Sequence, residues 1–319
     1  MSDRVTPPRV AALCLVSALA LLCACSPKPS GSGTAAAPGA DAAPLPPVGT
    51  YATSEEHYEA LKKQANGGQA LEWSKLPDWS GLWSRKMEGP VFAFDPHVKP
   101  VAQMGPMYGG HTAELTPEYQ AKLDKKIAEV AKGVEWDTLS NCLPAGHPRW
   151  LTEPFLKEII VTPAQTWWIN EQQSEVRRIY TDNRGHVPAD EAYPMWEGDS
   201  IGFWHNGVLT VHTNNLKSGQ YQRGQPDYSE QATTVEEIRM VNKDLMEDRV
   251  TVYDPPALKK PWTVTIRFER VKTPNLRIAM WSCNENNNVV QTPDGSSNFI
   301  LPGEKGYKDP NDLAATAKK

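Results

Sequence analysis

The feature that most constrains the fold is a series of short strand-like segments that begins at Leu156. Turn residues interrupt the series, and the linkers are too short to hold crossover helices, so neighbouring strands should run antiparallel. The clearest linker is Asn206-Gly207, because this pair suits the positive φ angles of a type I′ hairpin turn. The expected strands are Leu156–Thr162, Thr166–Glu171, Val176–Thr181, Ser200–His205, Val208–Thr213, Thr234–Val241, Asp248–Tyr253, Trp262–Arg270 and Arg277–Cys283.

The segment from Trp262 to Arg270 indicates how this sheet meets water. Apolar and polar residues alternate along it, so one face is buried and the other is solvated, as in a meander that closes into a barrel. Upstream, Gly81-Leu82-Trp83 resembles the Gly-x-Trp motif that opens lipocalin-like barrels. The predicted fold is mainly β: a large antiparallel β-meander that forms a lipocalin-like barrel or half-barrel, with two helices preceding it.

The two helices have clear boundary signals. Residues 54–66 begin with Ser54 as the expected N-cap, followed by two glutamates, and end at Asn66-Gly67-Gly68. The second helix has Thr116 as its expected N-cap and Pro117 at its first position, and it continues to about Lys132. A single narrow apolar stripe on the second helix indicates that it docks by one face.

The N-terminus reads as an export signal. A basic start precedes the apolar run Ala11–Leu22, which is shorter than the about 20 residues needed to cross a membrane. Leu22-Cys23-Ala24-Cys25 resembles the lipobox of bacterial lipoproteins, and that resemblance implies lipidation of Cys25. It also implies attachment to a membrane of the cell envelope, facing the periplasm or in the outer membrane. A plain signal peptide cleaved nearby is the alternative.

The chain divides into five expected parts. Pro, Ala, Gly and Ser dominate residues 26–50, a composition typical of a flexible tether. The expected parts are a signal peptide at 1–24, the tether at 25–50, a helical and irregular region with the first strand at 51–135, an antiparallel β domain at 136–300 and a polar tail at 301–319.

Charge and cysteine content limit the partners. Loss of the signal changes the formal net charge from −5 to −6, because two arginines and one aspartate leave with it, and no basic run remains. A nucleic-acid partner is therefore not expected. Cys142 and Cys283 remain in an oxidising compartment, so we expect a disulfide between them. A metal site that uses Cys142 with His147 is the alternative, but no further spaced ligands accompany it.

Ionisable and aromatic residues are densest between Tyr180 and Thr213, which marks this stretch as a candidate site. Its first group is Asp182, Arg184 and His186, on the loop that leaves a strand. An aspartate that orients an imidazole is the minimum for a general base. The alternative is an Asp-Asn-Arg-Gly turn held by local hydrogen bonds.

A second group consists of Glu197 and Asp199, with Trp196 and Trp204 on either side. Carboxylates beside aromatic faces are typical of carbohydrate or phenol binding, and a carboxylate pair can divide into acid and base. The alternative is turn capping with two core tryptophans. Glu197 and Asp199 share a side only if the segment is extended.

A third group follows from strand parity. Glu236 shares a face with Ile238 and Met240, so it is a buried carboxylate if that face lines the interior. Arg178 is its expected partner, and His212 is a further candidate base. The alternative is a purely structural ion pair.

Six sequence blocks resemble a large family of exported bacterial proteins. They lie at Cys142–Arg149, Arg177–His186, Trp196–Trp204, Leu209–Thr213, Asp254–Val264 and Cys283–Asn286. The resemblance covers roughly Pro77 to Asn286 and implies a shared fold, but it brings no known reaction with it. The hairpin His205-Asn206-Gly207 departs from the Glu-Gly-Asp expected there.

These patterns give three interpretations of function. The first is an envelope lipoprotein that binds a small apolar or aromatic molecule in a β-barrel pocket lined by Arg178, Arg184, Trp196, Glu197 and Trp204. The second is a hydrolase, lyase or isomerase that uses Asp182, His186, Asp199, His212 or Glu236. The third is a structural envelope protein. No phosphate loop, dinucleotide motif, nucleophile elbow or metalloprotease motif is present, so no cofactor and no metal is expected.

Overall fold

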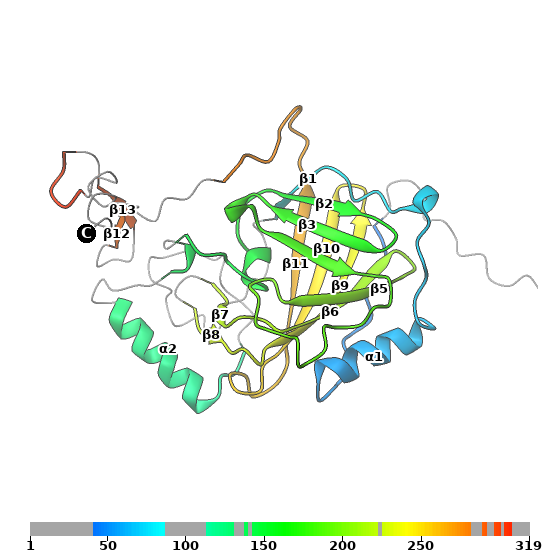
Figure 1. Ribbon diagram of the computed structural model, residues 1–319, viewed down its shortest axis with the longest axis horizontal. Coiled ribbons are helices and arrows are strands. Elements are labelled where there is room, and N and C mark those ends of the chain that lie inside the picture. The colour runs from blue at the N-terminus through cyan, green and yellow to red at the C-terminus, as the bar shows by residue number, and fades with distance from the viewer. Residues whose placement is uncertain are drawn as a thin grey trace, which may run out of the picture. The chain divides into compact units, whose positions relative to one another are not determined.

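The protein is mainly β, with a closed nine-strand barrel and two helices (Figure 1). The computed structural model describes residues 41–86, 113–130, 137–139, 142–222, 225–281, 289–291, 297–300 and 303–307. Around the barrel the strands follow the order β1–β11–β10–β9–β6–β5–β4–β3–β2. Their bounds are Leu82–Arg85 (β1), Lys157–Val161 (β2), Gln165–Asn170 (β3), Val176–Tyr180 (β4), Asp199–His205 (β5), Val208–Asn214 (β6), Thr233–Asn242 (β9), Leu245–Tyr253 (β10) and Trp262–Arg270 (β11).

Two short ribbons accompany the barrel. β7 (Gly219–Gln220) pairs with β8 (Asp227–Tyr228), and β12 (Val289–Gln291) pairs with β13 (Ser297–Phe299). Three short 3₁₀ helices lie at Trp73–Lys75, Arg149–Leu151 and Gln172–Ser174. No helix among the described residues is long and apolar enough to cross a membrane.

Eight of the nine predicted strands are present, with ends shifted by up to three residues. The prediction of a strand at Arg277–Cys283 is wrong for residues 277–281, which form none, and the rest of that range lies outside the described residues. β11 already pairs with β10 on one side and with β1 on the other. Because the barrel is closed there, no free edge remains for a further strand.

The predicted antiparallel pairing holds at every barrel neighbour except one. β4 and β5 run parallel, with Ile179 opposite Ser200 and Tyr180 opposite Ile201. Residues 181–198 connect these strands and are long enough to return the chain to the same end of the barrel without a helix. By contrast, Asn206 and Gly207 form the expected tight hairpin, and both have positive φ angles, +48° and +77°.

Large aromatic side chains fill the barrel interior. The inward face of β11 is the predicted one, with Trp262, Val264, Ile266 and Phe268 buried. Trp168 contacts both Trp150 and Phe268 edge to face, at ring distances of 5.6 and 5.5 Å. Burying each such side chain contributes about 1.5–3 kcal/mol, so these rings dominate the stability of the core.

Helix α1 (Ser54–Gln64) lies on the outer face of β6 and β9. Tyr58 and Ala65 pack there with Phe203, Val235 and Tyr253 in a small apolar cluster. The N-cap is Thr53, whose hydroxyl accepts a hydrogen bond from the amide of Glu56, and not Ser54 as predicted. Ser54 is instead the first helical residue, and its side chain turns towards the barrel wall.

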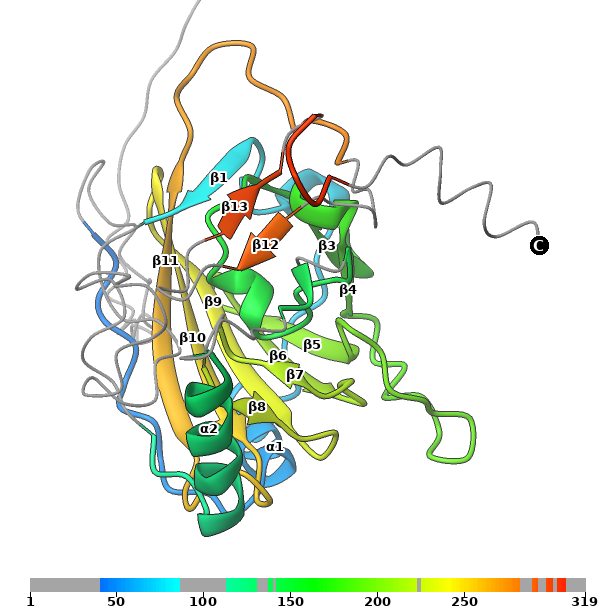
Figure 2. The same ribbon diagram turned by 90° about the vertical axis from the view of Figure 1, so that its left-hand side faces the viewer.

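Helix α2 (Pro117–Val130) lies beside β7 and β8, as both ribbon views show (Figures 1 and 2). The helix begins at Pro117 as predicted, and its expected last two residues lie outside the described residues. Lys126 forms an ion pair with Asp227 of β8 across this contact, at 3.0 Å.

The described end of the predicted tether is bound to the barrel at several positions. The amide of Ala42 donates to the carbonyl of Val241, and Arg239 donates to the carbonyl of Ala43. Arg249 donates to the carbonyl of Pro46. Arginine side chains of the strands thus donate hydrogen bonds to backbone carbonyls of the tether. The composition of the tether alone does not predict these contacts.

Candidate functional site

Three of the predicted catalytic residues come together outside the barrel wall. Nδ1 of His186 lies 2.7 Å from Oδ2 of Asp199, and Nε2 of His186 lies 2.6 Å from Nδ1 of His212. His186 comes from the loop after β4, Asp199 from the start of β5 and His212 from β6. The three side chains therefore form a continuous hydrogen-bonded chain.

A fourth residue, Ser54, ends this chain. Nε2 of His212 lies 2.8 Å from Oγ of Ser54, at the start of α1. The hydroxyl of Thr233 donates to the same oxygen at 2.7 Å, and the Ser54 hydroxyl also reaches Glu55 at 3.2 Å. We call Ser54, His212, His186 and Asp199 the relay. Sequence reasoning missed Ser54 because it lies 158 residues from His212.

The electrostatics of the relay fix the direction of its hydrogen bonds. Burial favours a neutral Asp199, but the hydrogen bonds from His186 and the Val187 amide outweigh it and lower the pKa of Asp199. Burial and the neighbouring His186 lower the pKa of His212 to about 4. With Asp199 ionised, each Nδ1–H donates towards the carboxylate, and Nε2 of His212 accepts from Ser54.

Asp182 and Arg184 lie apart from the relay. Arg184 donates to both carboxylate oxygens of Asp182, and its guanidinium lies 4.1 Å from the centre of the Tyr180 ring. Both side chains are substantially solvent-exposed, and Asn183 and Gly185 have positive φ angles. The hypothesis that Asp182 orients His186 is therefore wrong. The alternative, a turn held by its own side chains, describes this segment.

Glu236 is buried inside the barrel, as parity predicted, but its partner is Arg177 and not Arg178. Arg177 shares its inward face with Ile179, whereas Arg178 is exposed with its guanidinium 5.1 Å from the Trp167 ring centre. Two adjacent arginines on one strand necessarily point to opposite faces. The prediction therefore chose the wrong arginine.

A second acid accompanies the Arg177–Glu236 pair. Burial raises the pKa of Glu236, but the charge of Arg177 outweighs this and lowers it overall. Burial and the Glu236 charge raise the pKa of Asp248 well above its usual value. The two effects favour the neutral form of Asp248. His147 lies 3.6 Å from Glu236, and burial lowers its pKa to about 3.

Glu197 and Asp199 do not form an acid–base pair. Asp199 belongs to the relay, whereas the carboxylate of Glu197 is buried beside Glu175. Burial and the Glu175 charge raise the pKa of Glu197 well above its usual value, which favours the neutral form of this carboxyl. Glu175 also accepts from Asn170 at 2.9 Å.

Glu236, His212 and Trp204 do not line one cavity. Glu236 and Trp204 point into the barrel, and the Trp204 ring packs 4.8 Å from that of Trp79. His212 points to the outside, under α1. Val235, opposite His212 in the sheet, likewise faces out, so the barrel wall separates the two groups.

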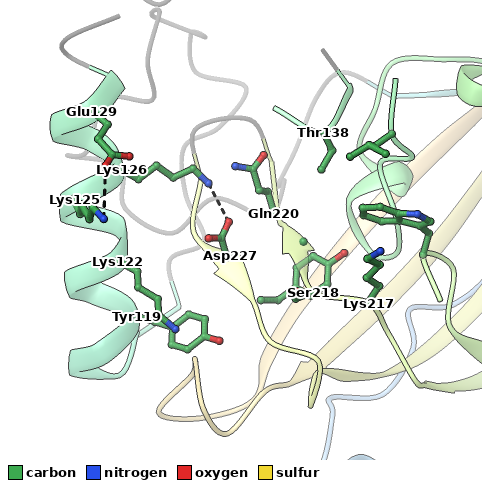
Figure 3. A pocket seen from close by; sticks show the side chains of 14 residues that line it. Tyr119, Lys122, Lys125, Lys126, Glu129, Thr138, Lys217, Ser218, Gln220 and Asp227 are labelled. Carbon is green, nitrogen blue, oxygen red and sulfur yellow. Dashed lines mark hydrogen bonds and ion pairs between the residues drawn. The ribbon is translucent and has the colours of Figure 1, made fainter. Parts of the chain in front are cut away.

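A hollow lies between α2 and the β7–β8 ribbon (Figure 3). Its volume is about 760 Å³, within the range of about 300–1,000 Å³ that holds small ligands. We call it the α2 pocket. Its aromatic lining comes from Tyr119, Trp196 and Tyr228, and its cations are Lys122, Lys125, Lys126 and Lys217.

The α2 pocket is positively charged. Its lining holds four lysines and two carboxylates. Three of the lysines are paired: Lys126 with Asp227 at 3.0 Å, Lys125 with Glu129 at 3.8 Å, and Lys122 with Glu118, outside the lining, at 2.8 Å. Lys217 lies 4.9 Å from the Trp196 ring centre, and no carboxylate in the described part of the chain lies within 4 Å of its ammonium. Lys217 is therefore available to an anion.

The inner wall of the α2 pocket also holds a buried hydroxyl. Tyr228 is 1% exposed, and its hydroxyl has no hydrogen-bond partner among the described residues. Burial raises the pKa of this hydroxyl, so it stays protonated. Of the whole lining, sequence reasoning identified only Trp196, because the other members come from a surface helix and from turns.

The remaining sequence predictions lie partly or wholly outside the described residues. Cys25 is one of them, and so is Cys283, the expected partner of Cys142. Within the described part of the chain, no three His, Cys, Asp or Glu side chains are arranged to hold a metal ion. His147, the metal-binding alternative, hydrogen-bonds Thr234 at 2.9 Å.

A scan against protein-family models finds no match for this chain, and a search of curated proteins finds none either.

Proposed function

We propose that the chain is an envelope-anchored binding protein for a small molecule that joins an aromatic or apolar body to a negative charge. The observation that carries this proposal is the α2 pocket, where aromatic rings and Lys217, a lysine without a described carboxylate partner, line one hollow of ligand size. The aromatic or apolar ligand is the one expected from the sequence, but its site is the α2 pocket and not the barrel interior. The barrel interior is occupied by its own aromatic and charged side chains, whereas the α2 pocket lies outside it.

Different lining residues would contact different parts of the ligand. Trp196 and Tyr119 offer flat apolar surface to a ring. Lys217, which has no described carboxylate partner, attracts the charge of the ligand. A neutral ligand would leave Lys217 unpaired, and a cationic one would be repelled by it.

Fluorescence titration of the full-length chain tests this proposal. The probe is anilinonaphthalene sulfonate, an anionic aromatic dye, and N-phenylnaphthylamine is its neutral counterpart. We expect the anion to bind more tightly, and more weakly at high salt, because exposed charges are screened. Lys217→Gln should weaken binding about two- to fivefold, the worth of one partly exposed ion pair.

The matched control is Lys75→Gln, since Lys75 is an exposed lysine of the 3₁₀ helix at Trp73–Lys75 and is not part of the pocket lining. This change should leave the affinity of the dye unaltered. Equal affinity for the two dyes, or equal loss in both lysine variants, contradicts the proposal. Native mass spectrometry of chain purified from an envelope fraction then identifies any retained natural ligand.

The envelope location is a separate part of the proposal and rests on the lipobox-like Leu22–Cys25. Metabolic labelling with a radioactive fatty acid should modify the wild-type chain and not Cys25→Ser. Recovery of both proteins in the same soluble fraction would argue for a plain signal peptide. The ligand-binding test does not depend on this result.

A further inference from the structure

We propose that the relay is a second site, distinct from the α2 pocket, in which Ser54 is a base-activated nucleophile that accepts an acyl group from an ester. It rests on side chains that the α2 pocket does not contain. The first turn of α1 supplies Ser54, β6 supplies His212, and the connection between β4 and β5 supplies His186.

The spacing of the relay is that of an activated nucleophile. Hydrogen bonds of 2.8, 2.6 and 2.7 Å join the serine hydroxyl, the two imidazoles and the carboxylate in that order. A nucleophile bonded to a base, with the base oriented by a further group, is the arrangement that serine and cysteine nucleophiles require. Here a second imidazole stands between the base and the carboxylate.

Thr233 sets the direction of the Ser54 proton. Its hydroxyl donates to Oγ of Ser54 at 2.7 Å, so it does not compete for the serine proton as an acceptor. His212 accepts that proton at 2.8 Å, closer than the alternative acceptor Glu55 at 3.2 Å. A donor aimed at Oγ also stabilises negative charge on that oxygen during attack.

The second histidine overcomes the cost of burial. His212 is almost fully buried, so an imidazolium there is poorly solvated and His212 alone is a weak base. His186 is more exposed and contacts Asp199 directly. A proton that moves on to His186 therefore rests beside a carboxylate and near water.

The bond changes balance over two half-reactions. The Oγ of Ser54 attacks the ester carbonyl carbon and its proton moves to Nε2 of His212, while the Nδ1 proton of His212 moves to Nε2 of His186. The C–O bond to the alcohol then breaks, and the leaving oxygen takes a proton back from His212 as the relay reverses. Water repeats the same steps on the acyl-serine, releasing the acid and restoring Ser54.

Ser54 is shielded from water but lies close to the protein surface. It is 1% exposed, whereas the side chain of the adjacent residue, Glu55, is 63% exposed. A small, strongly electrophilic probe is therefore needed. Diisopropyl fluorophosphate meets this requirement, because its phosphorus is attacked by an activated serine with loss of fluoride.

The experiment treats the folded full-length chain with this probe and maps the adduct by peptide mass spectrometry. We expect phosphorylation of Ser54 in the native chain and not in urea. Ser229 is the internal control, since its hydroxyl donates to Asp254 at 2.5 Å and has no imidazole partner. It should stay unmodified.

Variants separate catalysis from simple packing. His212→Gln should slow modification of Ser54 at least about 100-fold, the usual worth of a general base. If that variant does not fold, Asp199→Asn provides the test at the far end of the relay from Ser54, where we expect a slowing of about tenfold or more. Near-ultraviolet circular dichroism establishes that each variant is folded.

Hydrolysis of p-nitrophenyl acetate gives an independent readout. Wild type should hydrolyse the ester with a rate that is lost in Ser54→Ala and unchanged in Ser229→Ala. An unmodified Ser54 in a folded wild-type chain overturns the proposal, and so does equal modification of wild type and Asp199→Asn. Either result would mean that the relay is only a structural hydrogen-bond network that holds α1 against the barrel. The dye titration of the α2 pocket is unaffected by both outcomes.

Discussion

The guanidinium of Arg177 forms a two-pronged ion pair with the carboxylate of Glu236 in the barrel interior, and both side chains are fully shielded from water. The guanidinium also contacts the hydroxyls of Ser200 and Thr213, at 3.2 and 2.8 Å. Every charge of the pair therefore has a partner. A buried pair of this kind is costly to break, because removal of one member leaves the other charge uncompensated.

Glu236→Gln should lower the free energy of unfolding by about 3–5 kcal/mol, because Arg177 is then left without its counter-charge. Urea denaturation measures this value. The control is Glu72→Gln, which breaks an exposed pair with Lys75 and should cost less than about 1 kcal/mol. Equal effects of the two changes would mean that water reaches Arg177.

Lys157 should make stability rise with pH above neutrality. Burial lowers its pKa to about 7, whereas the unfolded chain has the ordinary value of about 10.4. Between these values the unfolded state binds more protons than the folded one, so the free energy of unfolding increases with pH. Urea titrations between pH 7 and 10 should show this rise in wild type and its loss in Lys157→Met.

Three buried histidines should make the protein sensitive to mild acid. Burial is the main cause that lowers the pKa of His57 and His212 to about 4 and that of His147 to about 3. Below the unfolded pKa of about 6.5 the unfolded chain binds the extra protons, so stability is lost as pH falls towards 4. His212→Gln should reduce the slope of melting temperature against pH in this range, and a histidine replaced at the hairpin, His205→Gln, should not.

Gly198→Ala should be strongly destabilising. Gly198 has a φ of +65°, and a Cβ there would lie 2.6 Å from both the Asn214 carbonyl and the Thr213 methyl. Strain and overlap together should cost about 3 kcal/mol or more. Gly207→Ala is the matched control, since Gly207 has a φ of +77° with open space around it and should cost only about 1 kcal/mol. Similar losses in urea denaturation would show that backbone strain alone matters.

Much of the barrel could be predicted from local pattern. Alternating residues identified the buried face of β11, and Asn206-Gly207 identified the hairpin, because both signals act between near neighbours. The Arg277–Cys283 prediction failed since alternation says nothing about whether a sheet edge is free. Met280, in the middle of that segment, is 90% exposed.

The site was predictable only where its members are close in sequence. The dense stretch from Tyr180 to Thr213 contains His186, Asp199 and His212, which do meet. Ser54 reaches them only through the docking of α1, and the α2 pocket forms only through the docking of α2. Such contacts depend on tertiary packing, for which a single sequence carries no short-range signal.

The closure of the barrel has a consequence for the connection between β4 and β5. In a closed barrel with an odd number of strands, the strand direction cannot alternate all the way round. At least one pair of neighbours must therefore run parallel. The nine-strand barrel thus requires a parallel pair, and β4 and β5 form it. Two parallel neighbours need a long connection that brings the chain back to the same end of the barrel, and residues 181–198 provide it. His186, Trp196 and Glu197 belong to this connection, which a closed barrel of nine strands requires. Shortening it would therefore open the barrel as well as remove these residues.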